Sequence, residues 1–491
     1  MEISLFSASA VFQGALPHPV FIMTSLGPIF ADDLARVKPG DRLRLTISAQ
    51  TSDAAALAQA ALEARARGER VLVVCADPAD VPRLAQEMPW FEPNLDVRPL
   101  PDWETLPYDV LSPQEELVSE RLEALYRLTA PTGGADVLLT SAVTASQRLS
   151  PVSYIGANTF FFHQGEQISL TTLQKRLAAA GYANVKQVLA AGEFAVRGSI
   201  VDVFPMGSER PFRLDFFDDE IESIRWFDVD TQRSMESAEE IRLLPGHEFP
   251  VDPEALLAFR QRWRREFAGD PKKSIVYCDI EKEILPPGIE YYLPLFFDET
   301  AALTDYLPPN ARVFLLGDIE AALQAFGRDM ASRYKVLAAD PQRPALAPER
   351  IWLKPEEFFK SLANFARFTV EKKENAEDLK CLSGIEVDRK SQNPVGKLLE
   401  RTRESAMKGV RTLIAAPSAG RMETMSQLLR TGGLSVEEFS DWQTFLEADS
   451  SLGISAAPLF SGASTTMVAR LKPLMMRFRT GKCHASAAVP G

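Results

Sequence analysis

The chain has 491 residues, and at one domain per roughly 100–200 residues this length predicts about three to four domains and excludes a single core. Hydrophobic residues make up 46% and charged residues 25%, which excludes collagen-like, disordered and coiled-coil proteins. The chain holds 54 Lys and Arg against 67 Asp and Glu, a net charge of −13, so its surface as a whole repels nucleic acid and acidic membranes.

Segment 23–151 alternates short apolar runs with helical patterns. This spacing predicts parallel strands with crossover helices, which form the first half of one domain. The strands are expected at 43–47, 71–75 and 137–140, and the helices at 53–67, 81–88 and 113–128. Residues 100–109 form a proline-bracketed loop that we expect to cover an edge of the sheet. Residues 1–22 precede Met23, a more ordinary start, and are expected to be an N-terminal extension.

Residues 152–245 change to strand alternation and predict a compact α+β domain. Two β-prone runs flank the turn-rich triplet 218–220 and predict a hairpin. The expected elements are a strand at 160–168, a helix at 169–180, a strand at 193–204, and the hairpin strands 212–217 and 221–228. Because the α/β pattern returns after this unit, we interpret it as an insertion into the first domain.

Segment 246–350 is the expected second half of the first domain. It contains a helix at 252–267, an irregular segment at 285–294, and a strand and helix over 313–333. Residues 351–393 are expected to be a linker, because the charged stretch 371–393 has little power to bury surface.

Segment 394–462 predicts a small further α/β domain, with a helix at 395–407, a strand at 410–416 and a helix at 420–430. The tail 463–491 contains no acidic residue. We interpret it as a truncation scar or as translation out of frame and build no function on it; the alternative is a basic arm for nucleic acid.

The connection after the strand 43–47 is where a nucleotide-binding domain would place its phosphate loop, since glycine amides must approach the phosphates and a lysine must reach them. Here the connection reads Ser48, Ala49, Gln50, Thr51, Ser52 and Asp53. It has no glycine and no lysine, and Asp53 puts a negative charge where phosphate would sit. We therefore expect no nucleotide at this connection.

Other candidate sites are weaker. Asp219 and Glu220 superficially resemble the acidic pair of a magnesium site, but they fall in the expected hairpin turn and are interpreted as solvated.

The cysteines lie about a hundred or more residues apart, without the close pairs of a zinc site, so we expect reduced thiols in a cytoplasmic protein and no metal. No run approaches the ~20 apolar residues of a membrane span, so no membrane contact is expected.

The strand 212–217 carries the strongest signal for binding. Its alternation directs Arg213, Asp215 and Phe217 to the face opposite the apolar residues. An aromatic ring beside a guanidinium is typical of protein–protein hot spots. Arg197 in the preceding strand is a second candidate cation, next to Gly198, which suits a bulge or a close backbone approach. The alternative is that Phe217 covers the hairpin end and that Arg213 pairs with a neighbour.

The charge of this domain favours a protein partner over DNA. Residues 151–250 contain 9 Lys and Arg against 15 Asp and Glu, a net charge of −6. An acidic domain repels the phosphate backbone.

Four segments give the sequence a family resemblance: 100–109, 192–207, 213–221 and 288–297. They closely resemble the N-terminal part of bacterial transcription-repair coupling factor, and the resemblance covers residues 24–460. It implies a degenerate P-loop-NTPase-like parallel-sheet domain, similar to the excinuclease protein UvrB, with an inserted α+β domain and a small α/β domain after it. It also implies transcription-coupled repair, in which the inserted domain docks the excinuclease protein UvrA through Arg197, Arg213 and Phe217.

In that family a polymerase-binding domain and two motor domains follow this module, and we expect them to be absent here. The resemblance implies that ATP, magnesium, RNA polymerase and double-stranded DNA bind only those missing domains, so this chain would be a truncated, non-catalytic copy without a cofactor. One alternative is an ATP-dependent DNA translocase or helicase-like enzyme, the activity of the full-length family. Another is a free-standing, damage-binding relative of UvrB, which would need a working phosphate loop.

Overall fold

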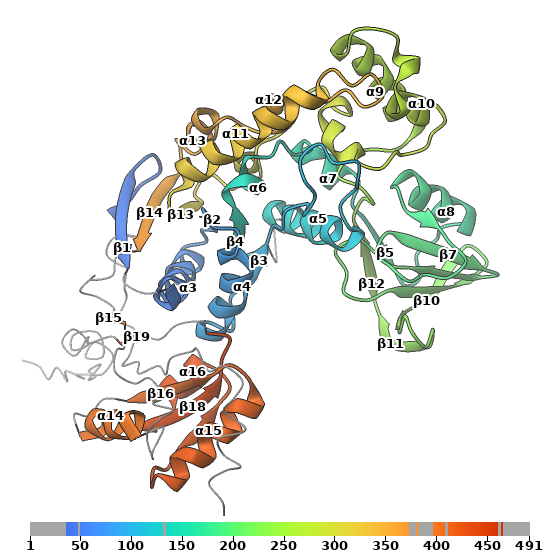
Figure 1. The fold of residues 1–491 in the computed structure, drawn as a ribbon. Coiled ribbons are helices and arrows are strands. Elements are labelled where there is room, and N and C mark those ends of the chain that lie inside the picture. Colours follow the sequence, from blue (N-terminus) through green and yellow to red (C-terminus); the bar gives the residue numbers. More distant parts are fainter. Residues whose placement is uncertain are drawn as a thin grey trace, which may run out of the picture.

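The computed structural model describes residues 36–47, 50–130, 134–372, 380–381, 396–407, 411–459 and 463–464 (Figure 1). The expected extension over 1–22 and nearly all of the tail 463–491 lie outside these residues. The structure is mixed α/β with several separate sheets. No helix within the described ranges combines the length and the apolar character that crossing a membrane requires.

One of two six-stranded sheets is entirely parallel, with the strand order β1-β14-β13-β2-β4-β3. The strands are β1 (Arg42–Ile47), β2 (Val71–Cys75), β3 (Val97–Pro99), β4 (Val137–Ser141), β13 (Arg312–Leu316) and β14 (Ala366–Lys372). Its central strands β2, β4 and β13 are buried at every residue, which explains their continuous apolar runs.

Helices cover both faces of this sheet. In β2, Val71 and Val73 pack into one core cluster with α3 and α4, while Leu72 and Val74 pack into another with α5 and α11. This is the alternation that a strand imposes on its side chains. The covering helices are α3 (Gln50–Ala66), α4 (Asp80–Phe91), α5 (Glu115–Thr129), α6 (Ala142–Ser146), α11 (Ile319–Leu337) and α13 (Pro355–Ser361).

The strand β14 corrects the expected linker over 351–393. It lies between β1 and β13, and Phe368 is fully buried with its ring stacked on Phe314, 4.7 Å between centroids. Residues 355–361 also form a helix, α13. The linker prediction is therefore wrong up to Lys372. It relied on the charged residues from Glu371 onward and overlooked the alternating apolar residues Ala366, Phe368 and Val370 before them.

The chain leaves the parallel sheet after β4 and returns to it at β13, and a second sheet lies between. This sheet has the order β11-β10-β9-β8-β7-β6, and helix α8 (Leu170–Ala179) packs on one face of it. Its strands are β6 (Ala183–Asn184), β7 (Glu193–Arg197), β8 (Ile200–Val203), β9 (Phe212–Phe217), β10 (Glu220–Phe227) and β11 (Ser234–Ala238). A two-stranded sheet pairs β5 (Phe160–His163) with β12 (Glu240–Leu243).

Two strand predictions in this region are wrong. The expected strand 193–204 is a hairpin, in which β7 and β8 pair antiparallel across Gly198 and Ser199. Gly198 has φ +64°, and no atom lies within 4 Å of the position that a β-carbon would take there, so this glycine serves a turn and not a close approach. The expected strand 160–168 ends at His163.

Residues 249–352 add an aromatic layer beside the sheet, built around Trp263, Tyr292 and Trp352. Its helices are α9 (Pro253–Glu266), α10 (Ile275–Glu281), the 3₁₀ helix η2 (Ile289–Leu295) and α12 (Pro348–Ile351). The segment 285–294 is thus helical at its end, where the sequence predicted irregular structure.

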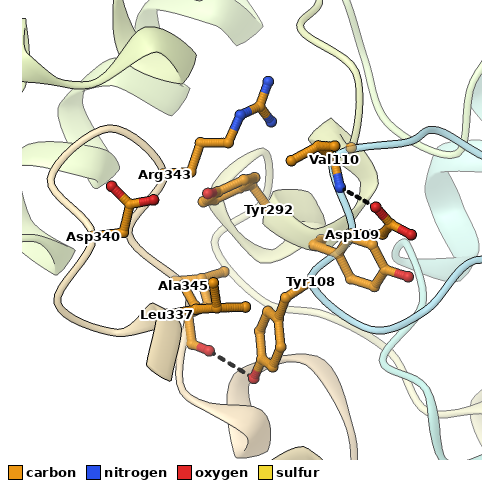
Figure 2. Close-up of a pocket in the computed structure, with 11 residues that line it drawn as sticks. Tyr108, Asp109, Val110, Tyr292, Leu337, Asp340, Arg343 and Ala345 are labelled. Atoms are coloured by element: carbon orange, nitrogen blue, oxygen red, sulfur yellow. Dashed lines mark hydrogen bonds between the residues drawn. The ribbon is translucent and has the colours of Figure 1, made fainter. Parts of the chain in front are cut away.

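The loop 100–109 is held by this aromatic layer. Tyr108 packs edge-on against Trp352, 5.8 Å between centroids, and its hydroxyl donates to the carbonyl of Leu346 at 2.9 Å. Figure 2 shows the residues that line a pocket beside it, among them Tyr292 and Arg343. The volume of this pocket is about 70 Å³. This pocket has room for a few waters.

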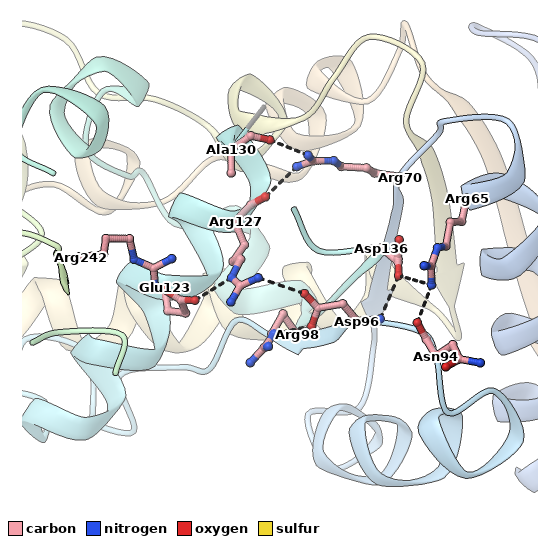
Figure 3. A network of polar contacts seen from close by, with 10 residues as sticks. All are labelled: Arg65, Arg70, Asn94, Asp96, Arg98, Glu123, Arg127, Ala130, Asp136 and Arg242. Atoms are coloured by element: carbon pink, nitrogen blue, oxygen red, sulfur yellow. Dashed lines mark hydrogen bonds and ion pairs between the residues drawn. The ribbon is translucent and has the colours of Figure 1, made fainter. Parts of the chain in front are cut away.

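Helix α5 connects the parallel sheet to the inserted domain through polar contacts (Figure 3). Arg70 caps the C-terminal end of α5 by donating to the carbonyls of Arg127 (2.7 Å) and Ala130 (2.8 Å). On the other side, Glu123 of α5 binds Arg242 of β12. Charged contacts at the C-terminal end and in the middle of α5 thus link this helix to the sheet and to the insertion.

The small C-terminal unit has a three-stranded parallel sheet in the order β16-β18-β17. It packs against α4, where Trp90 donates to the hydroxyl of Ser455 at 3.2 Å and lies 6.4 Å from the ring of Trp442. Its elements are α14 (Gly396–Met407), β16 (Thr412–Ala416), α15 (Ala419–Thr431), β17 (Glu437–Phe439), α16 (Trp442–Glu447) and β18 (Leu452–Ala456).

The position of β14 predicts the effect of a core substitution. We expect Phe368→Ala to lower the free energy of unfolding of the parallel-sheet unit by about 3–5 kcal/mol, because it leaves a cavity inside a packed sheet. Val336→Ala, at a highly exposed position of α11, is the control and should change little. Calorimetric unfolding of both variants measures this. Equal unfolding temperatures for the two variants would show that residues 366–372 do not contribute to the hydrophobic core.

Candidate functional site

The candidate site lies on the face of the inserted sheet that α8 does not cover. Strand β9 alternates as predicted: Phe212, Leu214 and Phe216 are buried and pack into the core cluster that contains α8. Arg213, Asp215 and Phe217 point to the opposite face, which we call the outer face.

Phe217 is the exposed aromatic residue of the outer face. It ends β9 and 69% of its surface is exposed. The next residue, Asp218, has φ +53° and begins the turn into β10, so the chain reverses directly beside the ring. A ring this exposed packs little against the hairpin, which disfavours the alternative that Phe217 only covers the hairpin end.

Arg213 is fixed within the domain. Its Nε and Nη2 donate to the two carboxylate oxygens of Asp202 at 2.6 and 3.0 Å, and only 17% of its side chain is exposed. Its Nη1 donates to the carbonyl of Gln232 at 3.1 Å and to the hydroxyl of Ser234 at 3.2 Å. The guanidinium also lies 4.9 Å from the ring centre of Phe227. The hydrogen bond with Asp202 is the main reason that the pKa of Arg213 is raised.

Asp202 is the functional residue that sequence reasoning missed. It is fully buried in β8, directly opposite Arg213, and its carboxylate also binds Arg197. Arg197 itself remains 48% exposed at the end of β7. One buried carboxylate therefore holds both candidate arginines. An acidic residue between Val201 and Val203 in an apolar strand was the available signal, because a buried charge needs a partner.

Asp219 lies in the exposed turn between β9 and β10, as predicted, whereas Glu220 is the first residue of β10 and pairs with Phe217. The Glu220 carboxylate accepts a hydrogen bond from the Gln167 side chain at 2.8 Å. In the part of the chain that the structure describes, no three His, Cys, Asp or Glu side chains gather in a way that could hold a metal ion.

The expected phosphate-loop position differs from the prediction in one respect. Helix α3 begins at Gln50, so Asp53 lies in its first turn and not in the connection. Ser48 and Ala49 fall outside the described residues, as do the side chains of Gln50, Thr51 and Ser52.

Asp53 is fully buried and bound by a guanidinium from α4. Arg83 donates to its two carboxylate oxygens at 2.8 and 2.6 Å, and also contacts Asp80 and Glu87. Burial alone would lower the pKa of Arg83, but its hydrogen bond and charge pairing with Asp53 outweigh burial and raise it. The first turn of α3, where a helix favours an anion, thus carries the protein's own carboxylate.

The cleft at the carboxyl ends of the strands is acidic. Open α/β sheets bind ligands at this edge. Here a cleft of about 700 Å³ is lined by five carboxylate side chains and one cation, Arg44, which pairs with Glu371 at 3.1 Å. The five carboxylates belong to Asp77, Asp80, Asp318, Glu320 and Glu371. Such a lining repels a triphosphate.

Two family models match the chain. The UvrB interaction domain matches residues 160–249, which include the outer face, and the MFD D3 domain matches residues 406–470.

Curated relatives are similar over longer stretches. The transcription-repair-coupling factor of Escherichia coli is 42% identical over 298 residues, 60% of this chain and 26% of the relative. That of Haemophilus influenzae is 38% identical over 368 residues, 73% of this chain and 31% of the relative. That of Bacillus subtilis is 32% identical over 216 residues, 41% of this chain and 18% of the relative. The chain therefore spans less than a third of the length of these relatives.

The buried carboxylate of Asp202 predicts a large effect of removing its charge. We expect Asp202→Asn to lower the free energy of unfolding of the inserted domain by about 3 kcal/mol, because two guanidinium groups lose their counter-ion. Asp215→Asn, on the same face but partly exposed, is the matched control and should change stability by less than about 1 kcal/mol. Thermal unfolding followed by circular dichroism measures both. The same midpoint for the two variants would contradict the role given to Asp202.

Proposed function

Because the chain belongs to the transcription-repair-coupling factor family, of which it spans one part, we propose that it acts in transcription-coupled DNA repair as a recruitment module. In this role the outer face of the inserted sheet docks the excinuclease protein UvrA, with Phe217, Arg197 and Arg213 as its contact residues. The observation that carries the proposal is an exposed Phe217 on the same sheet face as two arginines that share one buried carboxylate, within the residues matched by the UvrB interaction domain.

The physical chemistry of the outer face supports docking of a protein. Aromatic residues and arginines dominate binding hot spots, because they bury a large area and make directed hydrogen bonds. Asp202 orders both arginines before binding, so less side-chain entropy is lost on association. The net charge of −13 opposes a direct contact of this chain with DNA. We propose that double-stranded DNA and RNA polymerase are bound by parts of the relatives that this chain does not span.

We also propose that the parallel-sheet unit is a degenerate P-loop-NTPase-like domain that holds no nucleotide and no magnesium. The Arg83–Asp53 pair in the first turn of α3 and the acidic lining of the cleft support this. The translocase alternative would need a phosphate site, and no observation on the described residues favours one. The proposed compartment is the cytoplasm, where a thiol such as that of Cys278 stays reduced.

The docking proposal predicts which substitutions abolish binding. Isothermal titration of the 491-residue chain with purified UvrA should show binding, and Phe217→Ala should weaken it by about 2 kcal/mol or more. The triple variant Arg197→Ala, Arg213→Ala and Phe217→Ala should lose binding. Phe161→Ala removes another exposed aromatic ring of the same domain, outside the six-stranded sheet, and should bind normally. Equal binding by the triple variant and the unmodified chain would end the proposal.

The proposal that the parallel-sheet unit holds no nucleotide predicts that ATP does not change the stability of this chain. A ligand that binds only the folded state raises its stability, by about 2.7 kcal/mol at a hundredfold excess over Kd. We expect no shift of any unfolding transition with ATP and Mg²⁺ at millimolar concentration. A shift that ADP reproduces and that Asp53→Ala alters would place a nucleotide at α3 and contradict the proposal.

A further inference from the structure

The strand next to Arg213 carries another arginine on the outer face. Arg225 of β10 is the direct antiparallel partner of Arg213, and on its other side it faces Ser237 of β11. Residues directly opposite each other in an antiparallel pair place their side chains on the same face, with β-carbons about 4.5–5.5 Å apart. Arg225 therefore belongs to the same outer face as Arg213 and Phe217.

The two arginines differ in what their guanidinium groups can still bind. Arg213 uses four of its five N–H groups within the domain, on Asp202, Gln232 and Ser234. Arg225 is exposed, and within the residues that the structure describes it makes no hydrogen bond or ion pair. The arginine with free donors on this pair of strands is Arg225.

The surroundings of Arg225 leave its charge uncompensated. Like charges directly across two strands are unfavourable, and Arg213 avoids most of this cost through Asp202. Asp215, the nearest carboxylate along β9 on this face, stands opposite Ser223 and not opposite Arg225. A carboxylate brought by a partner would compensate Arg225 and would complete a bidentate pair.

Resting on the docking function proposed above, we propose that Arg225 binds a surface carboxylate of the docked partner, while Arg213 mainly positions the face. The contact area then has two parts. An apolar part is centred on Phe217 at the end of β9, and an electrostatic part is centred on Arg225, four residues away along the strands, about 13 Å. This separation fits within one protein interface of ordinary size.

The occupant follows from charge complementarity. The inserted domain is acidic overall, with nine basic and fifteen acidic residues over 151–250, so it attracts an acidic partner surface only where cations gather. Arg197 and Arg225 are the exposed cations of this cluster. They select an acidic surface patch of the partner that lies next to an apolar pocket for Phe217.

A charge reversal tests the proposal. Arg225→Glu should weaken binding to purified UvrA about tenfold or more, mainly by slowing association, and should reduce the dependence of the association rate on salt. Lys175→Glu makes the same change of charge on α8, the helix on the opposite face, and is the matched control. Because both positions are exposed, both variants should keep the unfolding midpoint of the unmodified chain.

The outcomes separate this inference from the docking function itself. If Phe217→Ala weakens binding and Arg225→Glu behaves like Lys175→Glu, the role of Arg225 is overturned while the docking function stands. If the unmodified chain does not bind UvrA, the docking function fails and the role of Arg225 fails with it. A salt-sensitive loss of binding confined to Arg225→Glu supports the inference.

Discussion

A carboxylate removed from water needs a guanidinium beside it, and this constraint determines what both halves of the molecule can do. Asp53 in α3 and Asp202 in β8 are fully buried, and each accepts two hydrogen bonds from one arginine of a neighbouring element. In the parallel sheet the pair places a negative group in the first turn of a helix, where an anion would bind. In the inserted sheet Asp202 holds two arginines on the face that also carries the exposed ring of Phe217. The proposed absence of a nucleotide site and the proposed docking face thus depend on the same kind of interaction.

The inserted domain can present its face because other ion pairs hold it in place. Arg121 of α5 is fully buried against Glu248, with a contact of 2.5 Å, and Arg242 of β12 binds Glu123 on the same helix. Both contacts lie where the insertion meets α5, away from β9 and β10. In Figure 1 the strands β7 and β10 lie on the far side of α5 from the parallel sheet, so the outer face is not covered by that sheet.

The sequence predicts local patterns well and pairings poorly. The apolar run of β2 and the alternation of β9 depend only on neighbouring residues, and both are confirmed. Arg197 was a candidate cation in the sequence because it lies next to Gly198, and the family resemblance implied the same residue. By contrast, Asp202 acquires its role from the register between β8 and β9, and Arg225 from the register between β9 and β10. Strand β14 was missed because its partners β1 and β13 are far away in the sequence and charged residues follow it.

The register also explains why two arginines that face each other should respond differently to salt. The pair between Arg213 and Asp202 is mostly shielded from water, so dissolved ions screen it little. Arg225 is exposed, and its attraction to an approaching carboxylate is screened beyond a Debye length of about 8 Å at physiological ionic strength. Salt should therefore leave the shape of the outer face intact while it slows the encounter with an acidic partner. Arg213 therefore stabilises the face, because Asp202 already neutralises its guanidinium. The exposed guanidinium of Arg225 remains available to attract the partner.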